Sequence, residues 1–221
     1  MTQDRLTKAT VAECALRLAD AEGLEAVTIR RLAKEQGVTP MALYWHFKNK
    51  DELLLGMVDH ALSGVRAEPG TGDPWQKRLR TVIETVAGVL RDHPSLPTLL
   101  HAVDKTQTES FNRATNDTLA LLSDAGFTVE EGYWVAMHLL NGCIGMVSGQ
   151  PGCPPTVPPE QAAEWLRQKR LHLESMASDR FPLMVEFAAS YRDEPDVEHY
   201  YAFSIDLLVA GVETMAANRR A

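Results

Sequence analysis

The stretch that decides the fold is TIRRLAKEQGVTPMALYWHFKNK, residues 28–50. It predicts two short helices joined by a sharp turn, because Thr28 and Thr39 are good N-cap residues and Gly37 can adopt the positive φ that the turn requires. Pro40 occupies the first position of the second helix, where its missing N–H costs no hydrogen bond. The spacing indicates a helix-turn-helix, although a helical hairpin of no particular purpose would share it.

The second of these helices is expected to end at Phe47, which with Leu43 forms its apolar inner face. The outer side then carries Pro40, Met41, Tyr44 and Trp45, flanked by Ala42 and His46. Large apolar groups beside basic residues are unfavourable on a free surface, and they suit a surface that enters a groove.

The formal net charge of the chain is −8, which taken alone argues against nucleic acid as a partner. The charge is unevenly spread, because residues 28–50 carry +4 and residues 61–221 carry −7. Lys48 and Lys50 flank the start of the next helix, where free N–H groups already favour a phosphate. We therefore expect Tyr44, His46 and Lys50 to contact the backbone of a DNA duplex.

The rest of the chain is also expected to be helical. A first helix runs from Leu6 to Gly23, and Asn49 caps a fourth helix with Glu52 at the capping-box spacing. Further helices are expected near 75–92, 95–103, 107–125, 129–148, 160–177, 180–191 and 197–218. Residues 67–74 form the clearest break, and Gly149–Pro159, with five prolines, predicts an exposed and mobile loop. No strand-like alternation or internal repeat is found, so the class is all-α.

Several functional classes are not expected. Cys14, Cys143 and Cys153 are odd in number and lack C-x-x-C spacing, which favours a reducing, cytoplasmic location and neither a disulfide frame nor a zinc site. The longest nearly apolar run, 134–147, is shorter than the roughly 20 residues of a membrane span. No secretion signal is evident, and no nucleotide, hydrolase or metalloprotease motif is present. We expect neither an enzyme nor a cofactor.

Three strings, TIRRLA at 28–33, GVT at 37–39 and LYWHFKNKDELL at 43–54, closely resemble the DNA-binding domain of the tetracycline-repressor (TetR) family of transcriptional regulators. The LYWHxKNK portion resembles the tetracycline repressors themselves. The resemblance is close over residues 5–60 and weaker beyond. It implies an N-terminal three-helix helix-turn-helix domain at 1–50, a connecting helix at 51–66, and a larger helical ligand-binding and dimerisation domain at 67–221.

The resemblance also implies roles for single residues. Arg30 would reach a base edge, Pro40, Met41 and Ala42 would face bases, and Thr28 would join the backbone contacts. The full set of expected DNA contacts is Thr28, Arg30, Thr39, Pro40, Met41, Ala42, Tyr44, Trp45, His46, Lys48 and Lys50. Because Pro40, Met41 and Ala42 offer no side-chain hydrogen bond, direct readout would rest on Arg30 at a guanine and on apolar contact with thymine methyls.

The last predicted helix carries a seam of apolar residues at steps of three and four, namely Tyr201, Ile205, Leu208, Val212 and Met215. Helix-turn-helix proteins usually bind DNA as two-fold dimers, so we expect this seam at a homodimer interface. The resemblance implies that this helix and the helix at 129–148 form a four-helix bundle with their copies. The alternative is that the seam packs only inside its own chain.

The resemblance further implies a small-molecule effector that moves the fourth helix and releases the DNA. The candidate lining residues are His101, Thr115, Thr118, Tyr133, Met137 and Asn141, each of which is also compatible with a plain core or surface role. A magnesium–tetracycline complex is not expected, because only His101 falls near a metal-contacting position of the tetracycline repressors, while Arg66, Val82 and Val86 stand where they present ligand-contacting side chains. The Met, Leu and Val content favours an apolar or aromatic effector.

The expected function is that of a repressor released from a palindromic operator by such an effector. The alternatives are an activator of the same type, or a regulator without a small-molecule inducer.

Overall fold

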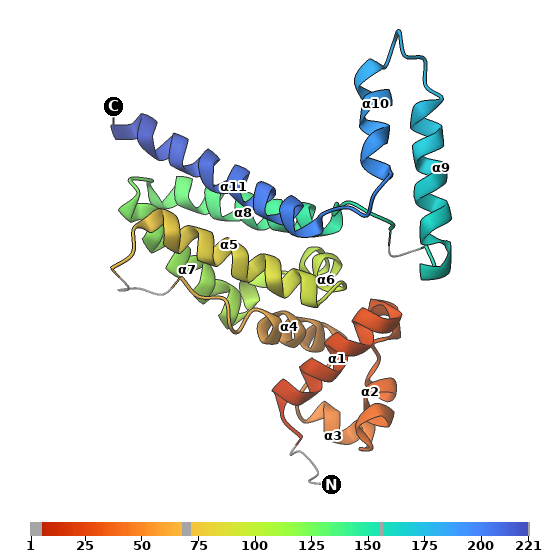
Figure 1. Cartoon of the computed structure of the whole chain (residues 1–221). Helices are drawn as coiled ribbons and strands as arrows, with labels where there is room; N and C mark the ends of the chain where they lie inside the picture. The colour runs from red at the N-terminus through yellow and green to blue at the C-terminus, as the bar shows by residue number, and fades with distance from the viewer. Residues whose placement is uncertain (1–5, 68–71, 155–156, 221) are drawn as a thin grey trace. The chain divides into compact units, whose positions relative to one another are not determined.

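The computed structural model of the protein describes residues 6–67, 72–154 and 157–220, and within these ranges every regular element is helical (Figure 1). The α-helices are α1 (Lys8–Glu22), α2 (Ile29–Gln36), α3 (Pro40–Tyr44), α4 (Lys50–Ala61), α5 (Trp75–Asp92), α6 (Leu96–Ala102), α7 (Glu109–Asp124), α8 (Val129–Ser148), α9 (Ala162–Glu174), α10 (Pro182–Phe187) and α11 (Val197–Arg220). Short 3₁₀ turns are η1 (Leu24–Ala26), η2 (Lys105–Gln107), η3 (Pro159–Gln161) and η4 (Ala188–Tyr191). The all-α class is confirmed.

The chain forms two compact units. The first contains the chain up to Ser148 and again from Ile205 onward, and the second is Gly149–Ser204. In the first unit α5, α7 and α8 pack against one another, and α1 packs on α4. In the second unit α9 and α10 form a helical hairpin with η4 (Figure 1). No helix within the described ranges is both long and apolar enough to cross a membrane.

We call α1 to α3, residues 8–47, the head, and α5 to α8 the body; α4 joins the two. The apolar face of α1 is fully buried and carries Val11, Ala15 and Leu16. Thr7 caps this helix in a reciprocal pair of hydrogen bonds with Thr10. The head is therefore a small hydrophobic core closed by α4.

The second helix of the helix-turn-helix, α3, which we call the recognition helix, ends earlier than expected, at Tyr44 and not at Phe47. The N–H groups of His46 and Phe47 both bond to Leu43 O, at 2.9 and 3.0 Å, so the last turn tightens. This turn carries the Phe47 ring into the core, where it is buried, and leaves Asn49 in an extended conformation to cap α4.

Two other boundaries differ from the expectation. The helix expected at 180–191 is interrupted, because α10 ends at Phe187 and a 3₁₀ turn follows. Residues 149–154 and 157–158 are irregular, as expected, but Pro151–Pro154 are half-buried, so the expectation of an exposed loop was wrong there. Residues 155–156 of that segment, and 68–71 of the predicted break, lie outside the described residues. The division at residues 50 and 66 stays a prediction.

Candidate nucleic-acid interface and apolar cavity

The sharp turn between α2 and α3 depends on Gly37. Gly37 ends α2 with φ 66°, a left-handed conformation that a residue with a Cβ rarely adopts. The next N–H, of Val38, bonds to Ala33 O at 2.9 Å. Leu32 and Leu43 are fully buried, so α2 and α3 meet through apolar faces. The predicted helix-turn-helix geometry is present.

Threonine hydroxyls cap both helices of this motif. Thr28 Oγ1 accepts from Arg31 N at 3.2 Å, and Thr39 Oγ1 accepts from Ala42 N at 3.3 Å. Both threonines are exposed. A hydroxyl that accepts such a bond keeps its own O–H, so each can also donate to an outside acceptor such as a phosphate oxygen.

The start of α4 lies directly after the recognition helix. Asn49 Oδ1 accepts from Glu52 N at 2.8 Å, as a cap does. Glu52 Oε2 accepts from Lys48 N at 2.9 Å, one residue before the N-cap, so the expected capping box is replaced by a wider loop. The loop holds the exposed Lys48 and Lys50 side chains on either side of the helix N-terminus.

The outer face of the recognition helix is exposed as expected. Trp45 is 86% exposed, Met41 67% and Tyr44 47%, whereas Leu43 and Phe47 are buried. Exposing three large apolar side chains on one turn and a half of helix is costly in water. Of the other expected contacts, Pro40 is exposed, and Ala42 and His46 are half-buried.

One basic residue of the segment is already paired within the head. Arg31 Nη2 lies 2.7 Å from Glu22 Oε1, and Arg31 Nε lies 2.8 Å from Glu35 Oε1. The hydrogen bonds that Arg31 donates to Glu22, followed by the one it donates to Glu35, raise the pKa of Arg31. Arg31 therefore braces α1 against α2. The cations presented to an outside partner are Arg30, Lys34, Lys48 and Lys50, all exposed.

The body holds a partly open apolar cavity of about 60 Å³. Its wall combines the residues that follow α4, Leu62 and Val65, with residues from three body helices. The latter are Leu79, Val82, Ile83 and Val86 of α5, Phe111, Ala114, Thr115 and Thr118 of α7, and Ala136, Met137, Leu139, Leu140 and Cys143 of α8. The wall is apolar in effect, because Thr118 Oγ1 donates to Ala114 O at 2.8 Å and so has its hydrogen bond.

The cavity brings together three of the six expected effector contacts, Thr115, Thr118 and Met137. The other three lie elsewhere. His101 is exposed with its Nδ1 2.8 Å from Pro97 O, and Tyr133 and Asn141 are exposed on α8. Asn141 follows the inward Leu140 by one residue, and therefore by about 100° around the helix.

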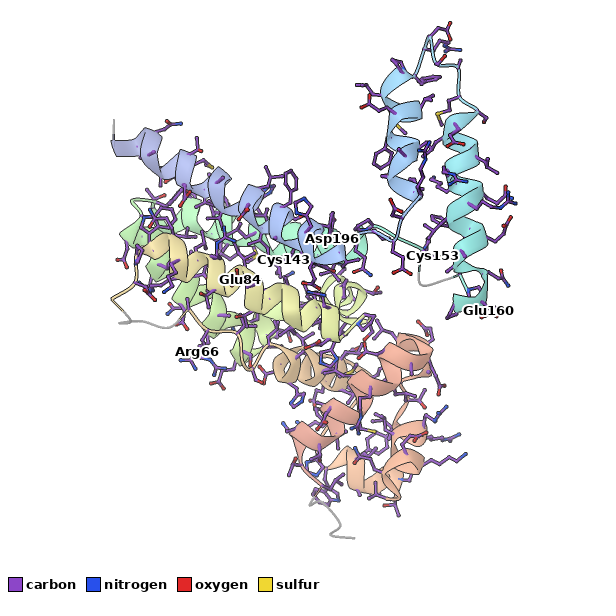
Figure 2. All side chains as sticks on the ribbon, viewed as in Figure 1. Arg66, Glu84, Cys143, Cys153, Glu160 and Asp196 are labelled. Atoms are coloured by element: carbon purple, nitrogen blue, oxygen red, sulfur yellow. The ribbon has the colours of Figure 1, made fainter. Side chains whose placement is uncertain are left out.

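Val82 and Val86 line the cavity at the positions for which the resemblance implied ligand contact, whereas Arg66 does not. Arg66 is exposed and its Nε lies 3.3 Å from Asp117 Oδ2. Figure 2 shows Arg66 at the edge of the first unit and Cys143 among its helices. The sequence pattern gave no reason to select Cys143 or Phe111 as lining residues, because apolar positions of cavity wall and solid core look alike.

Cys143 is the one thiol on the cavity wall, and it is buried. Burial raises its pKa to about 12, so it is a neutral thiol at physiological pH. Within the described ranges, no group of three or more His, Cys, Asp or Glu side chains is placed to hold a metal ion.

The predicted dimer seam on α11 mostly faces its own chain. Tyr201, Ile205 and Val212 are buried, and Leu208 packs so closely on α8 that a Cβ on Gly142 would lie 2.8 Å from it. Only Met215 of the five is exposed. These positions show that much of the seam packs inside one chain, and its place at a homodimer interface stays a prediction. The exposed apolar face of α11 instead carries Phe203, Leu207 and Met215.

Comparison with known proteins agrees with this geometry. Residues 13–57 match the family described as "Bacterial regulatory proteins, tetR family", and residues 68–216 match the "Tetracyclin repressor-like, C-terminal domain". The HTH-type transcriptional repressor DrrR1 of Streptomyces coeruleorubidus is 28% identical over 97% of this chain and 80% of its own length. The class E tetracycline repressor protein of Escherichia coli is 32% identical over 65% of this chain and 68% of its own length.

A solved structure shares the fold. ActR of Streptomyces coelicolor, a TetR family protein determined in complex with actinorhodin, superposes with a TM-score of 0.77 at 23% identity and covers 96% of this chain and 99% of its own. The two family matches together span both the helix-turn-helix and the helical body. The chain therefore belongs to the tetracycline-repressor (TetR) family of bacterial regulatory proteins.

Proposed function

We propose that this protein is a repressor that binds a palindromic DNA operator with the heads of two chains and is released by a small apolar or aromatic effector. The observation that carries the proposal is the exposed Tyr44 and Trp45 on a helix-turn-helix flanked by exposed lysines. Such a surface gains stability by entering a groove of DNA and by neutralising phosphates.

The contacts divide into two kinds. Thr28, Thr39, Lys48 and Lys50, with the N-terminus of α4, suit the phosphate backbone, which sets position and register. Arg30 is the exposed side chain suited to a bidentate pair with guanine O6 and N7, and the recognition helix adds apolar contact with thymine methyls. We expect one guanine under Arg30 in each half-site.

The effector site is the apolar cavity. Its volume, about 60 Å³, is well below the roughly 300–1,000 Å³ of ordinary ligand pockets, so an effector has to widen it. Leu62 and Val65 form part of the wall just after α4, and α4 begins beside the recognition helix at Lys50. Widening the cavity would displace α4, coupling the two sites by about 1–3 kcal/mol. The complex of ActR with actinorhodin supports an effector of this general kind.

Two chains are proposed to associate through the exposed faces of α8 and α11. The helices lie side by side, since Leu208 packs on Gly142 (Figure 1). Their outward surfaces carry Trp134, Phe203 and Leu207, each 60% exposed or more. Burying such a face stabilises a dimer by removing apolar area from water. A DNA-binding regulator of this kind would act in the cytoplasm, as the cysteine pattern predicted.

The proposal is tested by selecting sequences from a random DNA duplex library with the full-length protein. We expect a palindrome with a conserved guanine in each half. Neutral aromatics such as naphthalene and N-phenyl-1-naphthylamine are then screened by thermal shift, and those that raise the melting temperature should release the selected duplex. Recovery of no specific duplex would contradict the proposal. Stabilisation by these compounds without release would instead favour a regulator that lacks a small-molecule inducer.

A further inference from the structure

One carboxylate ties the head to the body. Asp20, in the last turn of α1, is 17% exposed, and its Oδ1 accepts from Ser95 N at 3.0 Å and from Ser95 Oγ at 2.6 Å. Its Oδ2 lies 2.8 Å from His93 Nδ1. His93 is the C-cap of α5 and Ser95 is the N-cap of α6, so three hydrogen bonds accepted by one carboxylate hold α1 against the corner between two body helices.

The contact is specific, because it uses a hydroxyl that would otherwise cap a helix of the body. Ser95 occupies the N-cap of α6, yet its hydroxyl donates to Asp20 and forms no cap bond within its own helix. A charge-assisted hydrogen bond is stronger than a neutral one, and the low exposure of Asp20 limits competition from water. The corner of the body is thus arranged around a side chain of the head.

A second attachment lies along α4. Asp59 Oδ1 accepts from Ser110 N at 2.8 Å, and Arg113 Nη2 donates to Ser63 O at 3.2 Å, so α4 is held to the start of α7. Beside it is an open cleft of about 1130 Å³, lined by Tyr44 and Lys48 on the head side and by Ser110 and Arg113 on the body side. The C-terminal end of α3 therefore borders open space on the side of α7, and the orientation of the head depends on its attachments at α1 and α4.

We propose that Asp20 is a positioning residue that fixes the orientation of the head, and thereby the spacing of the two half-sites that the dimer accepts. The inference rests on the proposed function and adds a determinant of operator choice that touches no DNA. With α4 as one attachment and Asp20 as the other, the head cannot turn about α4 into the cleft. Without Asp20 it can turn, and two heads can adapt to half-sites at more than one separation.

The test uses the operator obtained by selection and a second duplex with one base pair inserted at its centre. The insertion moves one half-site by about 3.4 Å and about 35° relative to the other. Affinity for both duplexes is measured by fluorescence anisotropy with full-length wild type, Asp20→Ala and Asp92→Ala. Asp92 is an exposed carboxylate one residue before His93, so Asp92→Ala is the matched control.

Wild type and Asp92→Ala should prefer the selected operator by about tenfold or more. Asp20→Ala should lower that preference to about threefold or less. A lower folded fraction weakens binding to both duplexes equally and leaves their ratio unchanged, so the ratio separates positioning from mere stability. If Asp20→Ala does not fold, Ser95→Ala replaces it, because this variant removes the hydroxyl and keeps the backbone N–H. It should also lower the preference for the selected operator.

An unchanged preference in Asp20→Ala, or in Ser95→Ala when that variant is used, would overturn the positioning role and leave the proposed function standing. Wild-type protein that binds neither duplex would overturn the proposed function and this inference with it.

Discussion

Gly56 of α4 lies directly against the ring of Phe47, so that a Cβ on Gly56 would stand 2.4 Å from Phe47 Cε1. Phe47 is the residue at which the chain leaves the recognition turn and enters the core. The absence of a side chain at Gly56 therefore sets how closely the recognition turn packs on α4, and through it on the body.

Replacing Gly56 with Ala should destabilise the protein by about 1–3 kcal/mol, because the added methyl overpacks a buried ring. It should also weaken operator binding, since a displaced Phe47 ring moves the recognition turn. Urea unfolding and gel shift check the two effects. Gly88→Ala is the control, because Gly88 is also inside a helix and a Cβ added there would meet nothing within 4 Å. This variant should stabilise the protein by up to about 1 kcal/mol. Equal changes in stability and in operator binding for Gly56→Ala and Gly88→Ala would contradict the overpacking of Phe47 by a methyl at Gly56.

Ala136→Leu should fill the apolar cavity, because Ala136 lies on its wall and the cavity is only about 60 Å³. The melting temperature should then no longer rise with N-phenyl-1-naphthylamine or any other neutral aromatic that stabilises wild type. The same change at Ala120, an exposed position on α7, should leave the response intact. If Ala136→Leu bound the probe as tightly as wild type, the effector site would have to lie outside this cavity.

Glu131 at the start of α8 pairs with Arg219 near the end of α11, with both carboxylate oxygens 2.8 Å from guanidinium nitrogens. The hydrogen bond from Arg219, with those from Thr128, lowers the pKa of Glu131 from 4.5 to about 2. A depressed carboxylate pKa adds stability that is present above pH 4.5 and is lost as the pH falls toward 2.

Glu131→Gln should therefore lower the melting temperature at pH 7, and its difference from wild type should shrink between pH 4.5 and about 2. Glu130→Gln, at the exposed neighbouring position, is the control and should show a smaller effect. Thermal unfolding followed by circular dichroism across this range makes the measurement. A difference that stays constant down to pH 2 would mean that the ionised pair contributes nothing.

Leu207→Glu should give monomers in light scattering without unfolding the chain, because Leu207 is 65% exposed on the outer face of α11. Leu208→Glu should instead destabilise each chain, because Leu208 packs on Gly142 within it. Together the two variants distinguish the outer side of α11 from the side that packs on α8. Dimers that persist in Leu207→Glu would contradict the proposed interface.

The local features of the head could be predicted from sequence because they depend on residues a few positions apart. Thr28, Thr39 and Asn49 cap the helices expected of them, and Leu43 and Phe47 point inward. The early end of α3 was missed, because it follows from the packing of Phe47 against α4, a tertiary effect that local propensity does not contain.

The body was harder to predict, since its features depend on which helices pack together. The seam on α11 has the period expected of an interface, but a period does not say whether the partner helix belongs to the same chain. For the same reason the sequence does not show that His101, Tyr133 and Asn141 lie on the surface and not on the cavity wall. Asp20 and Ser95, 75 residues apart in sequence, gave no local sign of their contact.

The salt dependence of operator binding reports whether the segment 28–50 binds DNA phosphates. For the selected operator, the logarithm of the affinity should fall linearly with the logarithm of salt concentration, with a slope of about −0.9 per phosphate neutralised. The double variant Lys48→Ala with Lys50→Ala should make this slope shallower by about 3 to 4 in a dimer, whereas Lys169→Ala, an exposed lysine of α9, should not change it. A slope near zero in wild type, or an unchanged slope in the double variant, would mean that Lys48 and Lys50 do not neutralise DNA phosphates.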